Sequence, residues 1–363
     1  MERVDRLKKL LGNRKLDALL VTQPQNRRYL SSFTAGDPNI SESSGALLIP
    51  RRGRPLLLTD FRYQLEAEAE AAGFEVLIYQ RGLLDLLGKI LVGRGIKRLA
   101  FEGHYFLYRT AGKLEVLAKK HAIKLTPTTG LVEGLRLRKS PAEIEKIRAA
   151  VRLNEQVFQE VFRDLRPGMS ERQVAIRIET LMREKGADGP AFETIVAGGS
   201  NGAKPHAVPS GRALRAGETV VIDMGLVLDG YCSDMTRTVV LGEMAKNTRD
   251  IFRLVRKAQK IGIETIRAGA TGAEVDRAAR RIIEQAGYGK RFGHGLGHGV
   301  GLAVHEGPGL SRRSKRKLKA GMVITVEPGI YLPDWGGVRL ENMVAVTEQG
   351  CEVLNSDTTF LDM

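Results

Sequence analysis

The feature that most constrains this chain is a repeat inside its C-terminal part. Residues 215–225 align without a gap on residues 319–329, and each stretch is an apolar run that ends in a carboxylate followed by x-Gly. The two carboxylates, Asp223 and Glu327, lie 104 positions apart. Self-similarity at a fixed offset indicates two related structural units. We expect each run to be a strand, and the two carboxylate-bearing strand ends to face each other across a pseudo-two-fold axis.

The helix starts of the two halves repeat as well. Ser170 is followed three residues later by Gln, and Thr271 by Glu. Both patterns are capping boxes, in which the two side chains satisfy free backbone N–H groups at a helix start. Each predicted helix stops near a glycine, Gly186 in the first half and Gly287 in the second. Each half is therefore predicted to run from a capped helix through a glycine-rich segment into a carboxylate-bearing strand.

The N-terminal part is organised differently, as apolar runs that alternate with helical patterns. Strands are predicted at residues 16–21, 45–49, 55–59, 75–79 and 98–101, and helices at 61–72 and 83–93. This alternation predicts a small α/β domain with a mixed sheet over residues 1–130, in which we find no catalytic constellation. Turn-forming residues at 126–130 and a capped helix start at Ser140 mark the passage into a second domain, residues 131–363.

Composition bounds the class of protein. A length of 363 residues predicts two domains, and 42% apolar residues suffice for large cores. Two cysteines, Cys232 and Cys351, cannot form a disulfide scaffold and suit a reducing compartment. The charged N-terminus does not resemble a signal peptide, and no apolar run approaches the ~18 residues that span a membrane. We therefore expect a cytoplasmic protein with no membrane partner.

The chain is basic, with 57 Lys and Arg against 42 Asp and Glu, a net charge of +15. Basic proteins gain affinity by neutralising phosphates, which raises nucleic acid as a partner. Residues 312–319 form the one dense basic cluster. The chain has no zinc-finger or RNP pattern and no interleaving of aromatic and basic residues. A solvated charge run is the favoured interpretation, and specific nucleic-acid binding is the disfavoured alternative.

Two aspartates flank a predicted hairpin. Asp229-Gly230 is a hairpin-turn dipeptide, so Asp223 is predicted to end one strand and Asp234 to lie on its antiparallel partner. A carboxylate in a buried strand is costly unless it is paired, and two facing carboxylates repel unless a cation lies between them. A structural salt bridge is the alternative explanation for either aspartate.

The segment 292–301 is the densest motif in the chain. Glycine occupies every second position, and His294 and His298 stand between the glycines. The segment contains no Gly-x-Gly-x-x-Gly fingerprint, and no Walker Lys-Ser/Thr follows it, so a phosphate-binding loop is disfavoured. Closely approaching backbone that presents imidazoles is favoured instead. His206 and His305 lie in the same C-terminal part. A lone histidine is usually structural, but four gathered with strand-end carboxylates indicate a site.

Further carboxylates follow on the next strands. Glu327 precedes Pro-Gly, and Arg339 and Glu341 lie two residues apart on a predicted strand, so they share one face. A simple Arg–Glu ion pair would also explain the last two residues. Two Asp, two Glu and at least one His form a mainly oxygen donor set that suits two adjacent Mn²⁺, Co²⁺ or Zn²⁺ ions. Two such ions would activate a shared water for hydrolysis.

Taken together, these motifs resemble the metallopeptidases that include methionine aminopeptidase, aminopeptidase P and prolidase. The matching motifs are Asp223, Asp234-Met-Thr-Arg-Thr, Gly295-x-Gly-His-Gly-Val-Gly, Val304-His-Glu, Gly321-Met-Val-x-Thr-x-Glu-Pro-Gly and Arg339-x-Glu, within residues 140–360. The resemblance implies an α+β protein, with a C-terminal "pita-bread" domain that has an internal pseudo-two-fold repeat and a smaller α/β creatinase-like N-terminal domain. Methionine aminopeptidases lack that N-terminal domain, and creatinase lacks the metal ligands, which favours the aminopeptidase P and prolidase branch.

Carried over position by position, the resemblance implies five metal ligands. Asp234 and Glu341 would bridge two divalent ions. Asp223 would complete the coordination of one ion, and His298 and Glu327 that of the other. Mn²⁺ is the expected metal, with Co²⁺ and Zn²⁺ as alternatives.

The resemblance also implies roles toward the substrate. Glu327 would act as general base toward the attacking water. His206 and His305 match substrate-side imidazoles that would position the scissile carbonyl and stabilise the tetrahedral intermediate. His294 and Arg339 match accessory positions, and Arg339 would orient the bridging carboxylate.

The implied reaction is hydrolysis of the bond before proline. A dipeptidase must hold the free carboxylate of Xaa-Pro with a fixed cation, whereas an aminopeptidase must leave that direction open. Because Arg339 is expected to be engaged by the metal-site carboxylates, we expect an Xaa-Pro aminopeptidase, with an Xaa-Pro dipeptidase as the alternative. A non-catalytic binding protein on the same fold is the alternative from another class.

The resemblance bears on assembly as well. Relatives of this kind are commonly dimers in which the N-terminal domain reaches the neighbour's active site. A homodimer is therefore expected, with the polar, turn-rich residues 34–44 as the reaching loop.

Overall fold

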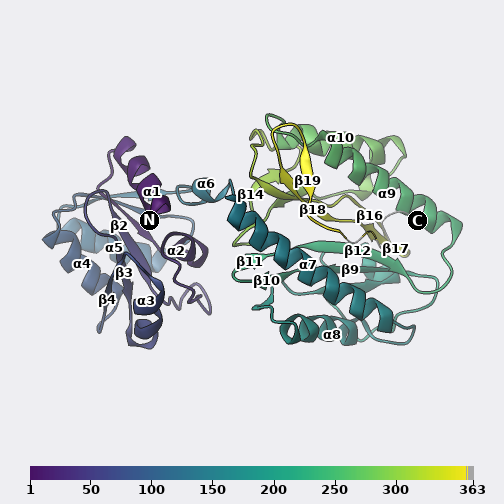
Figure 1. The fold of residues 1–363 in the computed structure, drawn as a ribbon, viewed down its shortest axis with the longest axis horizontal. Coiled ribbons are helices and arrows are strands. Elements are labelled where there is room, and N and C mark those ends of the chain that lie inside the picture. Colours follow the sequence, from purple (N-terminus) through teal and green to yellow (C-terminus); the bar gives the residue numbers. More distant parts are fainter. Residues whose placement is uncertain (357, 359–363) are drawn as a thin grey trace. The chain divides into compact units, whose positions relative to one another are not determined.

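The computed structural model describes residues 1–356 and 358, and the chain divides into two compact units, Met1–Arg136 and Leu137–Met363. Figure 1 shows that each unit combines sheets with covering helices. The short helix α6 (Glu133–Arg136) ends the first unit, whereas the sequence placed the boundary before it, after residue 130. Within the described residues, none of the helices combines the length and apolar character needed to cross a membrane.

A six-stranded sheet forms the first unit, in the order β4-β3-β2-β1-β5-β6. Its strands are β1 (Ala18–Val21), β2 (Ala46–Pro50), β3 (Leu56–Thr59), β4 (Glu75–Ile78), β5 (Arg98–Glu102) and β6 (Lys124–Thr128). β2 pairs antiparallel with β1 and β3, whereas the other three pairings are parallel, which confirms the predicted mixed sheet. β6 was not predicted from the sequence, because this edge strand is half-exposed and has no apolar run.

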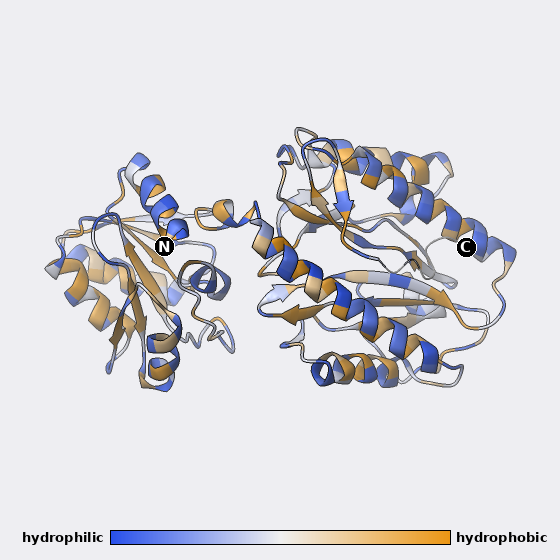
Figure 2. Cartoon of the chain, viewed as in Figure 1, coloured by the Kyte–Doolittle hydropathy of each residue, from blue (hydrophilic) through white to orange (hydrophobic). Residues whose placement is uncertain are grey.

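Helices pack on this sheet through apolar faces. They are α1 (Glu2–Asn13), α2 (Pro24–Ser31), α3 (Gln64–Glu70), α4 (Leu83–Gly93) and α5 (Tyr108–Lys120). The predicted helix at 83–93 is confirmed, and the one at 61–72 consists of a 3₁₀ turn (Phe61–Tyr63) followed by α3. Figure 2 shows the apolar strands and the two-sided helices that result. Burial of that apolar surface is the main force that holds the unit together.

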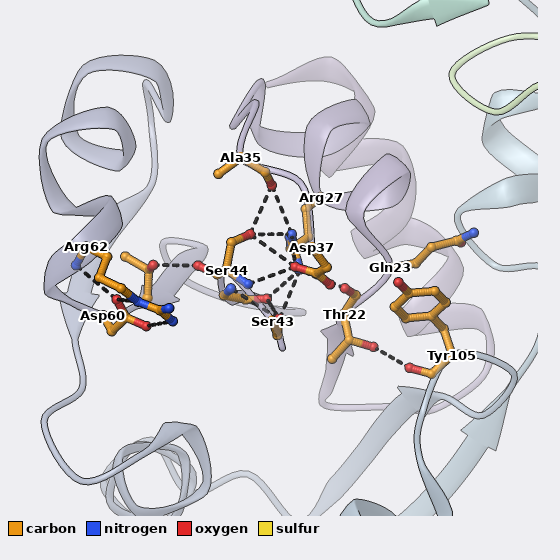
Figure 3. Close-up of polar contacts among 12 residues, drawn as sticks. Thr22, Gln23, Arg27, Ala35, Asp37, Ser43, Ser44, Asp60, Arg62 and Tyr105 are labelled. Atoms are coloured by element: carbon orange, nitrogen blue, oxygen red, sulfur yellow. Dashed lines mark hydrogen bonds and ion pairs between the residues drawn. The ribbon is translucent and has the colours of Figure 1, made fainter. Parts of the chain in front are cut away.

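A buried arginine fixes the loop at 34–44 in the first unit (Figure 3). Arg27, on α2, is fully buried and forms an ion pair with Asp37, with Nη2 and Oδ1 2.8 Å apart. The guanidinium also donates to two hydroxyls and three carbonyls, those of Ser43, Ser44, Thr22, Ala35 and Gly45. A single side chain therefore holds both ends of the loop to α2 and β2.

The second unit contains two main antiparallel sheets. The first has the order β12-β9-β8, and the second the order β14-β13-β15-β18-β19. The strands of these sheets are β8 (Ile195–Gly198), β9 (Thr219–Met224), β12 (Met235–Val240), β13 (Gly297–Gly299), β14 (Glu306–Leu310), β15 (Val323–Val326), β18 (Asn342–Val346) and β19 (Cys351–Val353). The shorter strands are β7 (Gly189–Pro190), β10 (Leu226–Leu228), β11 (Tyr231–Cys232), β16 (Gly329–Leu332) and β17 (Gly336–Arg339).

Four long helices cover these sheets: α7 (Pro141–Asp164), α8 (Glu171–Glu184), α9 (Lys246–Thr265) and α10 (Gly272–Gln285). Figure 1 shows α8 and α10 on opposite outer sides of the unit, with the strands between them. Each half has its own apolar core beneath its helices.

The internal repeat is visible in the backbone pairing. Both predicted capping boxes are present, at the starts of α8 and α10. The cap residue of each helix also forms an isolated bridge to the segment before the carboxylate-bearing strand, Ser170 to Ala213 and Thr271 to Lys317. The strand triplets β8-β9-β12 and β13-β15-β18 have the same antiparallel order. The predicted pseudo-two-fold architecture is confirmed.

Two local details differ from the prediction. The turn at residues 229–230 is present and joins β10 to β11, but the residue in register with Asp223 is Thr236. Asp234 lies one residue before β12, next to the register pair of Met235 and Met224. A Cβ at Gly225 would collide with the carbonyl of Ser233, so glycine is required for the close approach of the two chains at this point.

The predicted strand at 337–346 is also interrupted. β17 ends at Arg339 and β18 starts at Asn342, because the chain passes there from the two-stranded sheet into the five-stranded one. Glu341 lies in the break, so its side chain is free of the strict alternation of a strand.

Candidate metal centre and catalytic site

Five carboxylate and imidazole side chains meet in the second unit, where the strand ends of its two halves converge. They come from β9 (Asp223), the residue before β12 (Asp234), β13 (His298), the residue after β15 (Glu327) and the break before β18 (Glu341). Ligand atoms of Asp234, His298 and Glu341 lie within 4.8 Å of one another. His298 Nε2 lies 3.2 Å from Glu327 Oε1 and 3.6 Å from Asp234 Oδ2.

Two of these carboxylates have a buried oxygen that finds no hydrogen-bond partner among the described residues, Oδ1 of Asp223 and Oε1 of Glu341. Burial, and then the charges of Glu327 and Asp223, raise the pKa of Glu341 well above its usual range. Burial and the charge of Glu341 do the same to the pKa of Asp234. Like charges at this density are costly without a cation. Unpartnered carboxylate oxygens beside an imidazole nitrogen therefore fit divalent metal ions.

His298 and Glu327 form a close ion pair. Burial lowers the pKa of His298, but the hydrogen bond and charge of Glu327 outweigh it and raise that pKa to about 9. Burial raises the pKa of Glu327, but the hydrogen bond from His298 outweighs it and holds that pKa below its usual value. Glu327 is thus ionised at neutral pH, which is the state a general base requires.

Two threonine hydroxyls orient the carboxylates. Thr236 Oγ1 donates to Glu341 Oε2 over 2.7 Å. Thr325 Oγ1 donates to Glu327 Oε1 over 3.1 Å and accepts the backbone N–H of His298 over 3.1 Å. Both threonines are fully buried, and both belong to the matched motifs, although no role was predicted for them. The available signal was a threonine in a strand, two positions from a carboxylate: Thr236 from Asp234, and Thr325 from Glu327.

Arg339 contacts a different carboxylate from the one that was expected. Its Nη2 lies 2.6 Å from Oδ2 of Asp223, which was assigned to a single ion rather than to the bridge. Arg339 reaches the predicted bridging residue Glu341 only through Thr236, whose hydroxyl accepts from Arg339 Nε over 3.1 Å and donates to Glu341. Arg339 is 3% exposed, and its charge is paired with that of Asp223.

Tyr331, which the sequence analysis did not single out, joins Arg339 to His294. Its hydroxyl accepts from Arg339 Nη1 over 2.9 Å and lies 2.8 Å from His294 Nε2. Burial raises the pKa of Tyr331 to about 12, so the hydroxyl keeps its proton and can donate it to Nε2. Burial also lowers the pKa of His294, which favours a neutral imidazole with its Nδ1–H on the carbonyl of Gly295.

The nine predicted site residues all line one cavity of about 420 Å³: His206, Asp223, Asp234, His294, His298, His305, Glu327, Arg339 and Glu341. His206 and His305 are the exposed members. The ring of His305 lies 4.3 Å from that of His298, centroid to centroid, and burial and then His298 lower the pKa of His305. The other lining residues are mainly apolar, among them Phe192, Ile195, Pro205 and Val208.

The basic run 312–319 contributes no residue to this cavity. Arg312 forms an exposed ion pair with Glu284, and Lys317 bridges to the cap of α10 through its backbone. These two residues of the run therefore make local structural contacts.

Comparison with known proteins gives a consistent result. Residues 145–348 match the model of metallopeptidase family M24, and residues 3–138 match that of the creatinase/prolidase N-terminal domain. The Xaa-Pro dipeptidase of Pyrococcus horikoshii is 35% identical over 97% of this chain and 96% of its own length.

Two solved structures are similar throughout. One is described as an Xaa-Pro dipeptidase from Bacillus anthracis, with 38% identity, 98% coverage of both chains and a TM-score of 0.91. The other is described as an X-Pro aminopeptidase from Thermotoga maritima, with 36% identity, coverage of 97% of this chain and 98% of that one, and a TM-score of 0.87.

Proposed function

Because the chain belongs to metallopeptidase family M24, in the branch of metallo-exopeptidases that contains aminopeptidase P and prolidase, we propose that it hydrolyses Xaa-Pro dipeptides. The observation that carries the proposal is the convergence of nine predicted residues on one cavity. The names of the relatives support a dipeptidase more than the aminopeptidase that we expected from the sequence.

Asp223, Asp234, His298, Glu327 and Glu341 would hold two divalent ions. We propose Mn²⁺, because four of the five donors are carboxylates and such donors suit this ion. When bound, the two ions would supply Lewis-acid activation and charge neutralisation for hydrolysis. Removing metal with a chelator and adding back Mn²⁺, Co²⁺ or Zn²⁺ would rank the metals by the activity each restores, and activity that survives complete removal would contradict the assignment.

The side chains around the ligands would do the remaining work. Glu327, ionised at neutral pH, would accept a proton from the attacking water. His305 and His206 would donate hydrogen bonds to the scissile carbonyl as its oxygen becomes negative. The apolar lining at Phe192 and Ile195 would suit a prolyl ring, which has no N–H to satisfy.

The deciding experiment compares kcat/KM for Xaa-Pro, Xaa-Pro-Xaa and an Xaa-Pro pentapeptide on the metal-loaded protein. A dipeptidase should cleave the dipeptide and lose activity with each added residue. Equal or better cleavage of the longer peptides would replace this proposal with an Xaa-Pro aminopeptidase.

The aminopeptidase remains the second candidate because of one observation. Among the described residues that line the cavity, the one Lys or Arg is Arg339, and it is already bonded to Asp223 and Tyr331. The lining also includes the acidic Glu193. A free substrate carboxylate would therefore rely on His206 or His305, or on a cation from outside this lining.

We also propose that the protein is a homodimer and acts in the reducing cytoplasm, in keeping with its two free cysteines. Light scattering at micromolar concentration should give twice the mass of the chain. A monomer mass would contradict the dimer.

A further inference from the structure

The segment 292–296 carries His294 but has almost no regular structure of its own. It lies between a 3₁₀ turn (Gly289–Arg291) and β13, and every second residue is glycine. Glycine loses more conformational freedom on folding than any other residue, so fixing such a segment needs interactions from outside it. Those interactions come from α10.

Asp276 and Arg280, one turn apart on α10, form a buried bidentate ion pair. Arg280 Nε donates to Asp276 Oδ2 over 2.9 Å, and Nη2 donates to Oδ1 over 2.8 Å. The two side chains are 0% and 6% exposed. A pair this dry costs desolvation energy, which the backbone groups around it must help to offset.

The remaining hydrogen bonds of this pair go to alternate residues of the segment. Arg280 Nη1 donates to the carbonyl of Phe292 over 2.8 Å, and Nη2 donates to the carbonyl of His294 over 2.7 Å. Asp276 Oδ1 accepts the N–H of Leu296 over 3.1 Å. The guanidinium also stacks 4.0 Å from the ring centroid of Phe292. Two side chains thus fix the backbone at 292, 294 and 296.

The fixed segment leads directly into the site. His294 lines the cavity and meets Tyr331 at 2.8 Å. The carbonyl of Leu296 accepts the backbone N–H of Glu327 over 2.8 Å, and the metal ligand His298 lies two residues further on. A shift of this segment would move the imidazole of His294 and the backbone carbonyl that holds the N–H of Glu327.

The first half of the repeat is an internal comparison. The positions on α8 that correspond to the pair, 101 residues earlier, are Ala175 and Glu179. Glu179 makes one long contact there, 3.4 Å from the backbone N of Thr194. The same helix-on-sheet arrangement thus forms without the ion pair, and the pair occurs in the half that presents the histidines.

We propose that Asp276 and Arg280 are positioning residues, which hold His294 and the backbone of Glu327 in the geometry that catalysis requires. The proposal rests on the peptidase function proposed above. It adds two residues that belong neither to the metal ligands nor to the cavity lining.

The test compares Arg280→Met, Arg280→Lys and Asp276→Asn with Arg212→Met as the matched control. Arg212 forms a similar bidentate pair with Glu218 in the first half, and neither residue lines the cavity. Hydrogen–deuterium exchange of the peptide that spans 292–298 should speed up by ~10-fold in Arg280→Met and stay unchanged in the control. Arg280→Lys keeps the charge but loses the fork, so it should restore protection only in part.

Kinetics give the second readout. Well below the melting temperature, kcat/KM on the cleaved substrate should fall by ~10-fold or more in Arg280→Met, chiefly in kcat, and recover partly in Arg280→Lys. In Asp276→Asn, which keeps the shape of the side chain, kcat/KM should lie between the values for Arg280→Met and Arg280→Lys. This variant also tests the proposal if Arg280→Met does not fold. Unchanged exchange of 292–298, or kcat/KM within twofold of wild type, would overturn the proposal. A wild-type protein without Xaa-Pro activity would refute the proposed function, while the exchange data would still decide the positioning role.

Discussion

Arg27→Met should strongly destabilise the first unit. Methionine can fill much of the space of the arginine stem, but it leaves Asp37, whose side chain is 2% exposed, without its cation. Asp37 would keep only the backbone N–H and hydroxyl of Ser44 as donors. Breaking a buried ion pair from one side costs about 3–5 kcal/mol. We expect a loss of about 4 kcal/mol, because the carbonyl of Thr22 loses a donor as well.

The opposite replacement should cost less. In Asp37→Asn the guanidinium keeps its hydrogen bonds to the carbonyls of Thr22, Ala35 and Gly45. The arginine therefore stays well coordinated, and the expected cost is roughly 1–2 kcal/mol, the value of a hydrogen bond to a charged group. This asymmetry follows from the seven acceptors that surround Arg27, as Figure 3 shows in part.

Urea unfolding followed by circular dichroism measures the effect. With a slope of about 2 kcal/mol per molar urea, a loss of 4 kcal/mol lowers the midpoint by roughly 2 M. Arg62→Met is the matched control, because Arg62 makes the same bidentate contact to Asp60 but its side chain is 67% exposed. Its midpoint should not move. Equal midpoints for Arg27→Met and Arg62→Met, or an Asp37→Asn loss as large as that of Arg27→Met, would refute the argument.

Three further predictions concern the second unit. Asp234→Asn should lower kcat/KM by more than ~100-fold, the loss typical when a residue that only supports a metal ligand is removed, and should leave the melting temperature unchanged. Wild-type turnover in this variant would refute the role of Asp234 as a metal ligand. Asp234, Glu341 and His298 have raised pKa values, that of His298 to about 9, so protons compete with metal at low pH. Saturating Mn²⁺ should therefore raise the melting temperature more at pH 8 than at pH 6, and the reverse order would contradict this. Thr271→Ala removes the capping hydroxyl of α10 and should cost about 1 kcal/mol in urea unfolding, without changing KM.

The sequence could predict which candidate ligands come together but not the network that holds them. Asp223, His298 and Glu327 each lie in a motif of glycine and apolar residues, so type and spacing were enough to select them. Tyr331 has no such context, and its role arises because β16 places its hydroxyl between His294 and Arg339, which come from distant parts of the chain. Contacts of this kind depend on how sheets are packed against each other, and local periodicity carries no information about that.

The same reasoning explains why the prediction of one continuous strand over residues 337–346 was wrong. Alternation along residues 337–346 predicts one strand, because Arg339 and Glu341 share a parity. The structure breaks the strand between them, since Arg339 pairs with Gly329 in one sheet and Asn342 pairs with Val326 in another. A change of sheet partner is a tertiary event that leaves the hydrophobic pattern intact.

The repeat itself shows how two similar halves form one asymmetric site. In the first half Thr236 lies in register with Asp223, and continuing the β15–β18 register by one residue places Glu341 opposite Glu327. Thr236 and Glu341 are thus equivalent positions, and they meet each other across the axis through a 2.7 Å hydrogen bond. A glutamate at position 236 as well would place a second buried negative charge in contact with that of Glu341. Instead, the hydroxyl of Thr236 in the first half donates to the carboxylate of Glu341 in the second. The two halves thus keep their strand-end carboxylates, Asp223 and Glu327, while the groups that meet at the axis are a donor and an acceptor and do not repel each other.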